Sequence, residues 1–431
     1  MNKQPTWFGH PRGLSILFLT NMWEQFSYYG MRALLVYYMT KQLMLGQSHA
    51  SFVYGAYTAC AYFTPILGGL LADRVLGKRR AIVTGASIMA LGHFMMTFDA
   101  LFYPALATIA LGNGLFLPSL PSQVGDLYAH GDARRSWAFN VYYVGVNIGG
   151  FLAPLICGTV GELYGWHYGF GLAGIGMLAG LIVYVAGQRY LPPELPRTPA
   201  PDAEPPRGMA RQTMLVLLGV GVAVTLFRAA YEQVGNTVAL WADTGVDRNA
   251  GGFAIPMTWF QSLNPLFVML MTPALLAWWQ RRAARGIDQP PLRRMACGAA
   301  IVAGAYLLLA AVNWNGGALT SWIWLLLFFL VLTFGELFIL PTGLGLFARL
   351  APRHLGSTTV AAWFLVTFAG SLSAGLVGGL WSRMQHGPFF ALLALLALLA
   401  AALLWRLDAP MRRADKPETR DAPASTAIHN T

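Results

Sequence analysis

Long apolar runs recur along almost the whole of this 431-residue chain, and each is closed by glycine, proline or charge. A helical run of about 20 apolar residues matches the hydrocarbon thickness of a bilayer. Only 11% of the residues are charged, whereas a soluble domain has about 25%. In lipid, backbone polar groups must be satisfied within the chain, which favours helices. The runs therefore predict an all-α membrane protein that crosses the bilayer many times.

The runs form two sets of six, which predicts twelve transmembrane helices in two six-helix bundles. The first set covers 13–39, 50–72, 80–98, 102–124, 137–160 and 167–187, and the second covers 212–240, 254–279, 292–312, 321–348, 356–382 and 387–406. Residues 191–211 are rich in proline and polar side chains, a composition typical of an extended linker. We expect an N-terminal bundle over 1–190, this linker, a C-terminal bundle over 212–408 and a disordered cytoplasmic tail over 409–431.

Basic residues are distributed unequally between the two sides of the predicted membrane protein. Of the 29 Lys and Arg residues, 24 fall at the termini, in the linker or in the even-numbered connections. The positive-inside rule then places both termini and the linker in the cytoplasm. The net charge of +11 is spread over short connections, so it indicates membrane topology rather than a nucleic-acid-binding surface.

Several patterns argue against an enzyme or a secreted, disulfide-linked protein. The cysteines Cys60, Cys157 and Cys297 lie within apolar runs, so we expect no disulfide framework, metal site or cofactor. The charged residues of the spans include no nucleophile beside a base. The first apolar run is too long for a signal peptide and lacks a cleavage pattern, so we expect it to be the first span.

Five charged residues fall inside the predicted spans: Glu24 and Arg32 in the first, Arg228 and Glu232 in the seventh, and Glu336 in the tenth. An ionised side chain that faces lipid at mid-depth costs about 3 kcal/mol even on lenient insertion scales. We therefore expect these side chains to converge on a polar cavity between the two halves, where a secondary transporter binds its substrate. A buried ion pair that only locks helices together is the alternative.

The loop after the second span, Gly69 to Arg80, combines an aspartate at a helix end with a basic cluster. It resembles the loop signature of the major facilitator superfamily, in which these residues latch cytoplasmic helix ends together. The resemblance implies the major facilitator fold and a gating role for Asp73 and Arg74. The alternative is an ordinary positive-inside loop with an aspartate at the end of a helix.

Four longer stretches resemble the proton-dependent oligopeptide transporters of that superfamily. They are EQFSYYGMR at 24–32; FNVYYVGVNIG at 139–149 with GELYGWHYGFG at 161–171; YEQ at 231–233 with WFQSLNP at 259–265; and ELF at 336–338 with WFL at 363–365. Together they cover nearly all of the predicted membrane part, in order. The resemblance implies a protein that binds short peptides in a cavity between the bundles.

The resemblance also implies a role for each matching residue. Arg32 occupies the position that helps to hold the peptide carboxylate, and Glu336 the position that receives the peptide amino terminus. A guanidinium suits a carboxylate by its bidentate geometry, which agrees with this division. The uncharged hydrogen-bonding positions are Tyr28, Tyr29, Tyr62, Asn147 and Asn264, and Trp363 is implied to line a side-chain pocket. For each aromatic residue, helix packing is the alternative.

The chain departs from the family pattern in the first and fourth spans. Where the family's first-span signature has Glu, Glu and Arg, this chain has Asn21, Glu24 and Gln25. The lysine of the fourth span is replaced by Leu117. These changes remove one negative and two positive charges, which indicates a concerted loss, because a buried lysine without its carboxylates would be unpaired.

Arg228 is an added cation, because the family more often has tryptophan there. It precedes Glu232 by one helical turn, close enough for an i,i+4 pair. We hypothesise that Arg32 and Arg228 hold Glu232 in the empty state, and that an arriving peptide carboxylate displaces it so that it takes up a proton. A static pair that keeps the seventh span in register is the alternative, and Glu24 is the other candidate coupling carboxylate.

The combined expectation is a bacterial-type inner-membrane transporter that imports di- and tripeptides together with protons. Its partners are then short peptides, protons and the lipid bilayer, without nucleic acid. A facilitator or exchanger with weak or absent proton coupling is the first alternative. A nutrient sensor built on a transporter fold is the second, and uptake into liposomes would separate it from both transporters.

Overall fold

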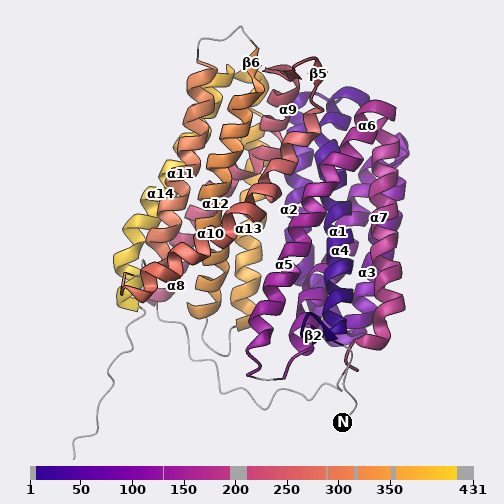
Figure 1. Ribbon diagram of the computed structural model, residues 1–431. Coiled ribbons are helices and arrows are strands. Elements are labelled where there is room, and N and C mark those ends of the chain that lie inside the picture. The colour runs from indigo at the N-terminus through magenta and orange to yellow at the C-terminus, as the bar shows by residue number, and fades with distance from the viewer. Residues whose placement is uncertain are drawn as a thin grey trace, which may run out of the picture.

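The computed structural model describes residues 6–129, 131–194, 211–287, 290–314, 319–350 and 356–414. Within these residues the chain is mostly helical, and the long helices run side by side (Figure 1). Most of the predicted linker and of the predicted C-terminal tail lies outside the described residues. The predictions for those two segments therefore stay predictions.

The first group of helices is formed by residues 12–187. Its helices are α1 (Arg12–Tyr37), α2 (Gln47–Leu71), α3 (Lys78–Met95), α4 (Phe102–Asp126), α5 (Arg134–Ala153), α6 (Thr159–Tyr164) and α7 (Trp166–Gly187). A π-helical turn, Pro154–Gly158, joins α5 to α6, because Pro154 has no N–H to continue the regular ladder. Helix α1 packs against α5 and α7, and α4 packs against α2 and α3.

The second group begins after the linker. Its helices are α8 (Arg211–Tyr231), α9 (Thr237–Thr244), α10 (Leu263–Ala284), α11 (Pro291–Val312), α12 (Trp322–Leu350), α13 (Gly356–Gly378) and α14 (His386–Ala414). Helix α11 packs against α12 and α14, and α8 packs against α13 and α14. The predicted seventh span is broken, because a 3-10 turn, Glu232–Gly235, separates α8 from α9.

Short strands add to the predicted all-α fold. The pairs are β1 (Thr6–Trp7) with β2 (His10–Pro11), β3 (Val246–Asp247) with β6 (Thr320–Ser321), and β4 (Asn249–Ala250) with β5 (Phe253–Ala254). The β4–β5 hairpin turns through Gly251 and Gly252, whose φ angles of +62° and +95° favour glycine. The strands are two residues long and leave the architecture helical.

Among the described residues, ten helical stretches are long and apolar enough to cross a membrane, judged by length and composition. The stretches that contain α1 and α3 are not among these ten. Helix α1 carries charged residues along its length, and α3 begins with three consecutive basic residues. Both helices nevertheless pack lengthwise against apolar neighbours of the first group.

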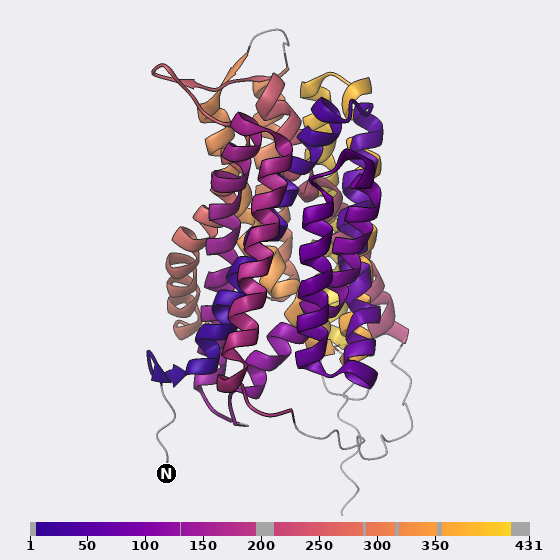
Figure 2. The same cartoon turned by 90° about the vertical axis from the view of Figure 1, so that its right-hand side faces the viewer.

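The helices define two ends of the molecule. We call the end near residues 191–194 and the start of α8 the linker end, and the end near the α1–α2 connection and strands β3 to β6 the far end. The linker end is at the bottom of Figures 1 and 2. The two groups meet where α2 packs against α13 and α5 against α10. Helices α2 and α13 approach so closely that a Cβ atom on Gly55 would lie 2.4 Å from the Cα of Gly375.

Hydrogen bonds join the two groups near the far end. The Gln47 side-chain amide of α2 donates to the carbonyl oxygen of Gly378, at 2.9 Å. One turn along α2, the buried Ser51 hydroxyl donates to Asn236 Oδ1, also at 2.9 Å. These bonds satisfy polar atoms that would otherwise be buried without partners. They tie α2 to both α13 and the α8–α9 connection.

Glu162 of α6 forms a second tie at the far end. Its Oε1 accepts hydrogen bonds from the backbone N–H of Thr258 at 2.9 Å and from the Thr258 hydroxyl at 2.7 Å, and its Oε2 accepts from the N–H of Met257 at 3.1 Å. The carboxylate thus caps the first turn of the segment that leads into α10. Next to it, the Trp259 indole donates to the Thr159 hydroxyl at 2.7 Å.

Removing the Glu162 cap should loosen the far end. Glu162→Ala deletes the acceptor of three hydrogen bonds. If their loss costs about 2 kcal/mol in total, the fraction of molecules with an open far end should rise roughly thirtyfold. The measurement is maleimide labelling of Ser51→Cys, with the native cysteines replaced by serine. Ser51 is fully buried between the groups, so labelling reports opening, and it should accelerate at least roughly tenfold.

The matched control is Glu194→Ala. Glu194 also caps a helix, but at the linker end and within the first group, where its carboxylate accepts from the N–H of Arg79 at 2.7 Å. Labelling at position 51 should therefore keep its original rate in this variant. An unchanged rate in Glu162→Ala would mean that the cap does not hold the far end closed.

Candidate functional site

A polar cavity of about 230 Å³ lies between the two groups. It is lined by Tyr29, Arg32, Tyr62, Tyr143, Val146, Asn147, Pro154, Arg228, Tyr231, Glu232, Val234, Gly235, Gln261, Asn264, Pro265, Val268 and Glu336. Four of the five charged residues that the sequence placed inside spans are in this set. The helices of both groups supply the lining, so a ligand here would contact both halves of the molecule.

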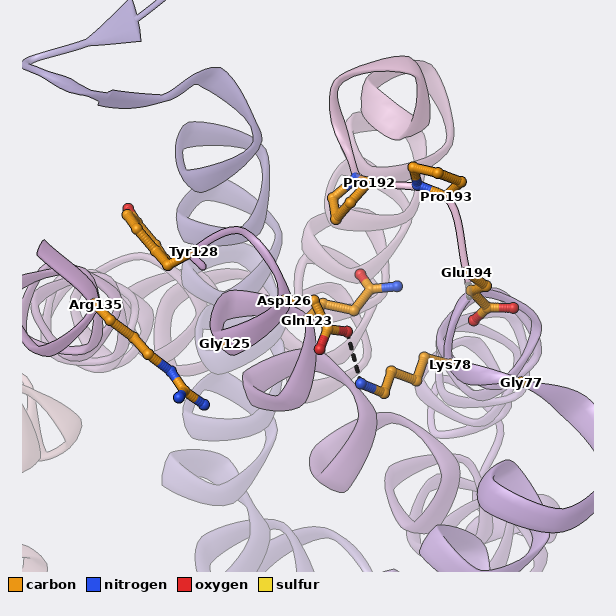
Figure 3. Close-up of a pocket in the computed structure, with 10 residues that line it drawn as sticks. All are labelled: Gly77, Lys78, Gln123, Gly125, Asp126, Tyr128, Arg135, Pro192, Pro193 and Glu194. Carbon is orange, nitrogen blue, oxygen red and sulfur yellow. Dashed lines mark hydrogen bonds and ion pairs between the residues drawn. The ribbon is translucent and has the colours of Figure 1, made fainter. Parts of the chain in front are cut away.

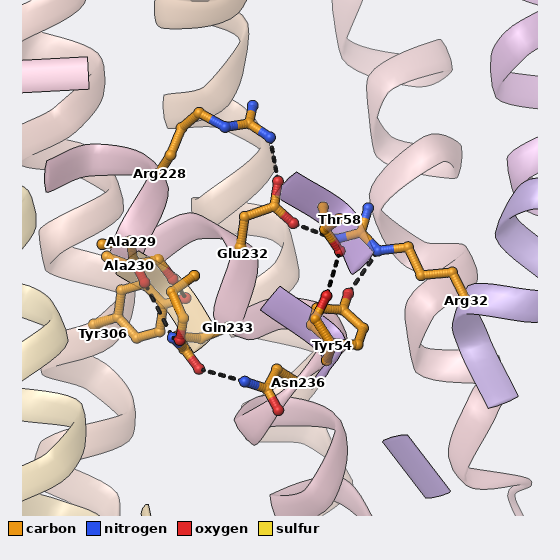
Figure 4. Close-up of polar contacts among 11 residues, drawn as sticks. Arg32, Tyr54, Thr58, Arg228, Ala229, Ala230, Glu232, Gln233, Asn236 and Tyr306 are labelled. Atoms are coloured by element: carbon orange, nitrogen blue, oxygen red, sulfur yellow. Dashed lines mark hydrogen bonds and ion pairs between the residues drawn. The ribbon is translucent and has the colours of Figure 1, made fainter. Parts of the chain in front are cut away.

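Glu232 is the centre of the charged cluster (Figure 4). The guanidinium of Arg32 donates to one of its carboxylate oxygens, and the guanidinium of Arg228 donates to the other. The Glu232 side chain is only 2% exposed. Arg32 Nε also donates to the hydroxyl of Tyr54, at 2.6 Å. Two cations from different groups therefore share one buried anion.

Local structure explains how these side chains meet. Arg228 lies in the last turn of α8, and Glu232 opens the 3-10 turn that follows, so the two are one turn apart. Each guanidinium also lies against a tyrosine ring of α2. The guanidinium carbon of Arg228 is 4.8 Å from the ring centre of Tyr62, and that of Arg32 is 5.4 Å from the ring centre of Tyr54. Cation–π contacts of this kind stabilise a buried charge.

Glu336 of α12 is the second carboxylate of the cavity. It is 6% exposed and accepts a hydrogen bond from the side-chain amide of Asn264 at 2.5 Å. The same amide also donates to the Thr333 hydroxyl at 3.1 Å. Glu336 belongs to the second group, whereas Arg32 belongs to the first. An anion and a cation therefore face the cavity from different groups.

The cavity suits a small zwitterion held without covalent chemistry. Its guanidinium groups can bind a carboxylate, the Glu336 carboxylate can bind an ammonium group, and its amides and phenols can bind peptide bonds. Within the described part of the chain, no group of three or more His, Cys, Asp and Glu residues could hold a metal ion. The arrangement supports binding rather than catalysis.

Two predicted substrate-binding residues are not part of this lining. The Tyr28 ring lies beside the cluster, with its centre 6.0 Å from the Arg32 guanidinium carbon. Trp363 of α13 packs towards α12, where a Cβ atom on Gly343 would lie 2.4 Å from its ring. The other six predicted substrate-binding residues line the cavity. The roles assigned to Tyr28 and Trp363 stay predictions.

Glu24 lies apart from the central cluster. It is 2% exposed, and its carboxylate accepts a hydrogen bond from the side-chain amide of Gln25 at 2.6 Å. Glu24 and Arg32 are eight residues apart on α1, which separates them by about 12 Å along the helix. Arg32 forms its ion pair with Glu232 of the other group.

A second cavity, of about 420 Å³, lies at the linker end (Figure 3). It is lined by Gly77, Lys78, Gln123, Gly125, Asp126, Tyr128, Arg135, Pro192, Pro193 and Glu194. Lys78 Nζ and Asp126 Oδ2 form an ion pair of 2.6 Å across it. The predicted gating residues, Asp73 and Arg74, lie on an exposed π-helical turn at the end of α2 and are not in this lining. Their gating role stays a prediction.

The start of the linker is fixed to the first group at this end. The Arg79 guanidinium donates to the carbonyl oxygens of Leu191 and Pro192, at 2.9 and 2.7 Å. Glu194 caps α3 at the same place, as described above. The basic loop after α2 therefore holds the chain as it leaves α7.

Sequence reasoning missed Tyr54, which contacts Arg32 beside the cavity but is not part of its lining. Tyr54 lies in an apolar run without charged residues, so no unusual residue type marked this position. A periodicity signal was present, however. Tyr54, Thr58 and Tyr62 follow one another at intervals of four, which places them on one face of α2. Two of these three residues contact the guanidinium groups of the cluster.

Comparisons with known proteins agree on one family. The model of the POT family matches residues 79–200 and 207–397. The peptide transporter YePEPT of Yersinia enterocolitica is 32% identical, over 95% of this chain and 96% of its own length. A di-/tripeptide transporter of Lactococcus lactis is 30% identical, over 95% of this chain and 98% of its own length.

Solved structures give the same result. A crystal structure of a peptide transporter POT in complex with sulfate matches with a TM-score of 0.89 at 29% identity, and it covers 95% of this chain and 97% of that one. A structure of a mutant POT in complex with alafosfalin matches with a TM-score of 0.88 at 30% identity, over 96% and 98% of the two chains. The chain therefore belongs to the POT family, whose members are multi-pass membrane transporters and not enzymes.

Proposed function

We propose that this protein is a secondary active transporter that imports di- and tripeptides together with protons by alternating access. The observation that carries the proposal is the cavity between the two groups. Arg32 of the first group and Glu336 of the second group both line it. Such a site fits both ends of a zwitterionic peptide. Two relatives, a peptide transporter and a di-/tripeptide transporter, support the same substrate class.

The proposal includes the membrane arrangement. All twelve long helical stretches cross the bilayer as two six-helix bundles, including those of α1 and α3, whose charged residues are buried in the protein or lie at a helix end. The linker end and both termini face the cytoplasm of a bacterial-type inner membrane, because that end carries most of the basic residues. The far end then faces outwards, and its hydrogen bonds hold the outer side of the cavity closed.

Substrate binding uses both walls of the cavity. Arg32 binds the peptide carboxylate and Glu336 binds the amino terminus. Asn147, Asn264 and the tyrosines Tyr28, Tyr29 and Tyr62 hydrogen-bond the peptide backbone, and Trp363 lines a side-chain pocket. Asp73 and Arg74 act in gating at the cytoplasmic ends of the helices. The burial of Glu336 beside the Asn264 amide supports its role, because a fixed carboxylate can receive an ammonium group without reorganising.

Proton coupling centres on Glu232. In the empty state, Arg32 and Arg228 hold its carboxylate. The ion pairs of Glu232 with these two arginines support this step. A peptide carboxylate that reaches Arg32 competes for this guanidinium. A buried carboxylate that loses its cations is disfavoured in the charged form, so Glu232 takes up a proton. A peptide facilitator or exchanger remains the alternative if Glu232 stays paired with Arg228 throughout.

Uptake of a labelled dipeptide into proteoliposomes tests the function. With an inward proton gradient, the protein should accumulate the dipeptide above its external concentration, because proton entry supplies the free energy. Without the gradient, uptake should stop at equilibrium. Equilibration under both conditions would indicate a facilitator, and no dipeptide movement in either would contradict peptide transport.

Glu336→Gln tests the amino-terminal site. Loss of the carboxylate removes a charge-assisted hydrogen bond, so the apparent affinity for a zwitterionic dipeptide should fall about tenfold or more. N-acetylated dipeptides have no ammonium group and should change little from their already weak binding. The measurement is competition against a labelled dipeptide. Equal losses for the two ligand types would show that Glu336 does not read the amino terminus.

Glu232→Gln separates coupling from a static structural pair. If Glu232 carries the proton, gradient-driven accumulation should disappear while exchange of labelled for unlabelled peptide continues. A static pair predicts unfolding or loss of both activities together, which size-exclusion chromatography and exchange assays would reveal. Accumulation at the wild-type level would exclude Glu232 as the coupling carboxylate and leave Glu24 as the remaining candidate.

A further inference from the structure

We propose that Arg228 makes this transporter prefer peptides with an acidic C-terminal residue, and that proton coupling is tightest for these peptides. The proposal rests on the proposed function. It assigns a direct substrate contact to Arg228, a residue that the function above uses only to hold Glu232. A C-terminal Asp or Glu carries two carboxylates on one residue, and the cavity contains two adjacent guanidinium groups to receive them.

The first step is the charge balance of the cavity. The residues that line it include two guanidinium groups, Arg32 and Arg228, and two carboxylates, Glu232 and Glu336. The empty, deprotonated site is therefore neutral, and a zwitterionic peptide leaves it neutral. Protonation of Glu232 then gives an excess positive charge in a buried site, which is strongly unfavourable. A second carboxylate on the peptide restores neutrality.

The second step is the bonding of Arg228 itself. Its side chain is 6% exposed, and its one ion pair among the described residues is with Glu232. Its guanidinium lies over the Tyr62 ring, and its Nε is buried without a hydrogen-bond partner. Arg32 likewise has a tyrosine partner, because its Nε donates to the Tyr54 hydroxyl. Neutralising Glu232 therefore removes the ion-pair partner of Arg228 and leaves its buried donors without an anion.

The third step places the extra carboxylate on the peptide. Arg32 and Arg228 contact the two oxygens of the same carboxylate, so the two guanidinium groups are close together. When Arg32 holds the terminal carboxylate, the side chain nearest Arg228 belongs to the C-terminal residue. The N-terminal residue is directed towards Glu336 instead. The preference should therefore depend on the position of the acidic residue.

The surroundings of Glu232 show which groups can compensate its charge. The titratable and charged groups that interact with it are Tyr28 and Arg32 of α1, Tyr54 of α2, Arg228 and Tyr231 of α8, Tyr306 of α11 and Glu336 of α12. The cations in this set are the two arginines. Glu232 is therefore released fully only when both arginines have other anions.

A neutral and an acidic peptide then behave differently. A peptide with one carboxylate occupies Arg32 and leaves Arg228 as a competing partner of Glu232, so Glu232 takes up a proton in only part of the transport cycles. A peptide with a C-terminal Asp or Glu occupies both guanidinium groups. Glu232 is released and takes up a proton, and it stays neutral while the cavity changes the side to which it is open. One cavity thus gives loose proton coupling with neutral peptides and tight proton coupling with acidic ones.

The test compares peptides of equal size in proteoliposomes at pH 7, where a glutamate side chain is ionised. Wild-type protein should bind Ala-Glu about tenfold more tightly than Ala-Gln, because a charge-assisted contact is gained. Glu-Ala should show no such advantage over Gln-Ala. Proton entry, followed with a pH-sensitive dye, should be greater per Ala-Glu than per Ala-Gln transported.

Variants assign the preference to the guanidinium. Arg228→Gln should lose the advantage of Ala-Glu while it still exchanges Ala-Gln, and Arg228→Lys should keep part of the advantage. Arg285→Gln, which removes an exposed arginine from the end of α10, should behave as wild type. If Arg228→Gln does not fold, the wild-type comparison of Ala-Glu with Glu-Ala and the Arg228→Lys variant decide the question.

The outcomes separate this proposal from the proposed function. Equal binding of Ala-Glu and Ala-Gln by wild-type protein, with both transported, would overturn the acidic preference and leave peptide transport standing. An advantage of Ala-Glu that survives in Arg228→Gln would assign it to another residue and overturn the role of Arg228. Failure to move any of the four dipeptides would instead contradict the proposed function.

Discussion

A charge cannot lie in the interior of a membrane protein without a partner, and the arrangement at Glu232 follows from this constraint. Arg32 comes from the first group of helices, whereas Arg228 and Glu232 come from the second, so the shared carboxylate is also a contact between the groups. The α8–α9 break at Glu232 places that carboxylate where both guanidinium groups reach it. A ligand that competes for Arg32 therefore changes a contact between the halves as well as a binding site.

The helices and the charged cluster could be predicted from the sequence because both rest on large free-energy costs. Apolar runs long enough to cross a bilayer have few alternatives to a helix. Charged side chains within the membrane require partners of opposite charge or a polar cavity. Local backbone detail was not predictable in this way. Apolar periodicity alone encodes neither the π-helical turn at Pro154–Gly158, which begins at a proline inside an apolar run, nor the 3-10 turn after Tyr231.

In the candidate site, too, some residues could be predicted from the sequence and others could not. Arg32, Glu232 and Glu336 stood out because their charges are rare in apolar runs, whereas Tyr54 has no such signal, although its hydroxyl bonds Arg32. Glu24 lies on the same helix as Arg32, but the helical rise separates the two, and the Glu24 carboxylate accepts a hydrogen bond from Gln25.

The central ion pair and the far-end ties must act together if the two groups are to move. The Arg32–Glu232 contact is one of several, because Glu162 caps the segment before α10 and α2 packs closely on α13. Breaking the ion pair alone removes one tie and leaves the others in place. Opening of the far end therefore requires that the capping bonds of Glu162 and the α2–α13 contact also separate. In the proposed transport cycle, the Arg32–Glu232 pair controls when the two groups separate, and the far-end hydrogen bonds contribute to the free-energy cost of that separation.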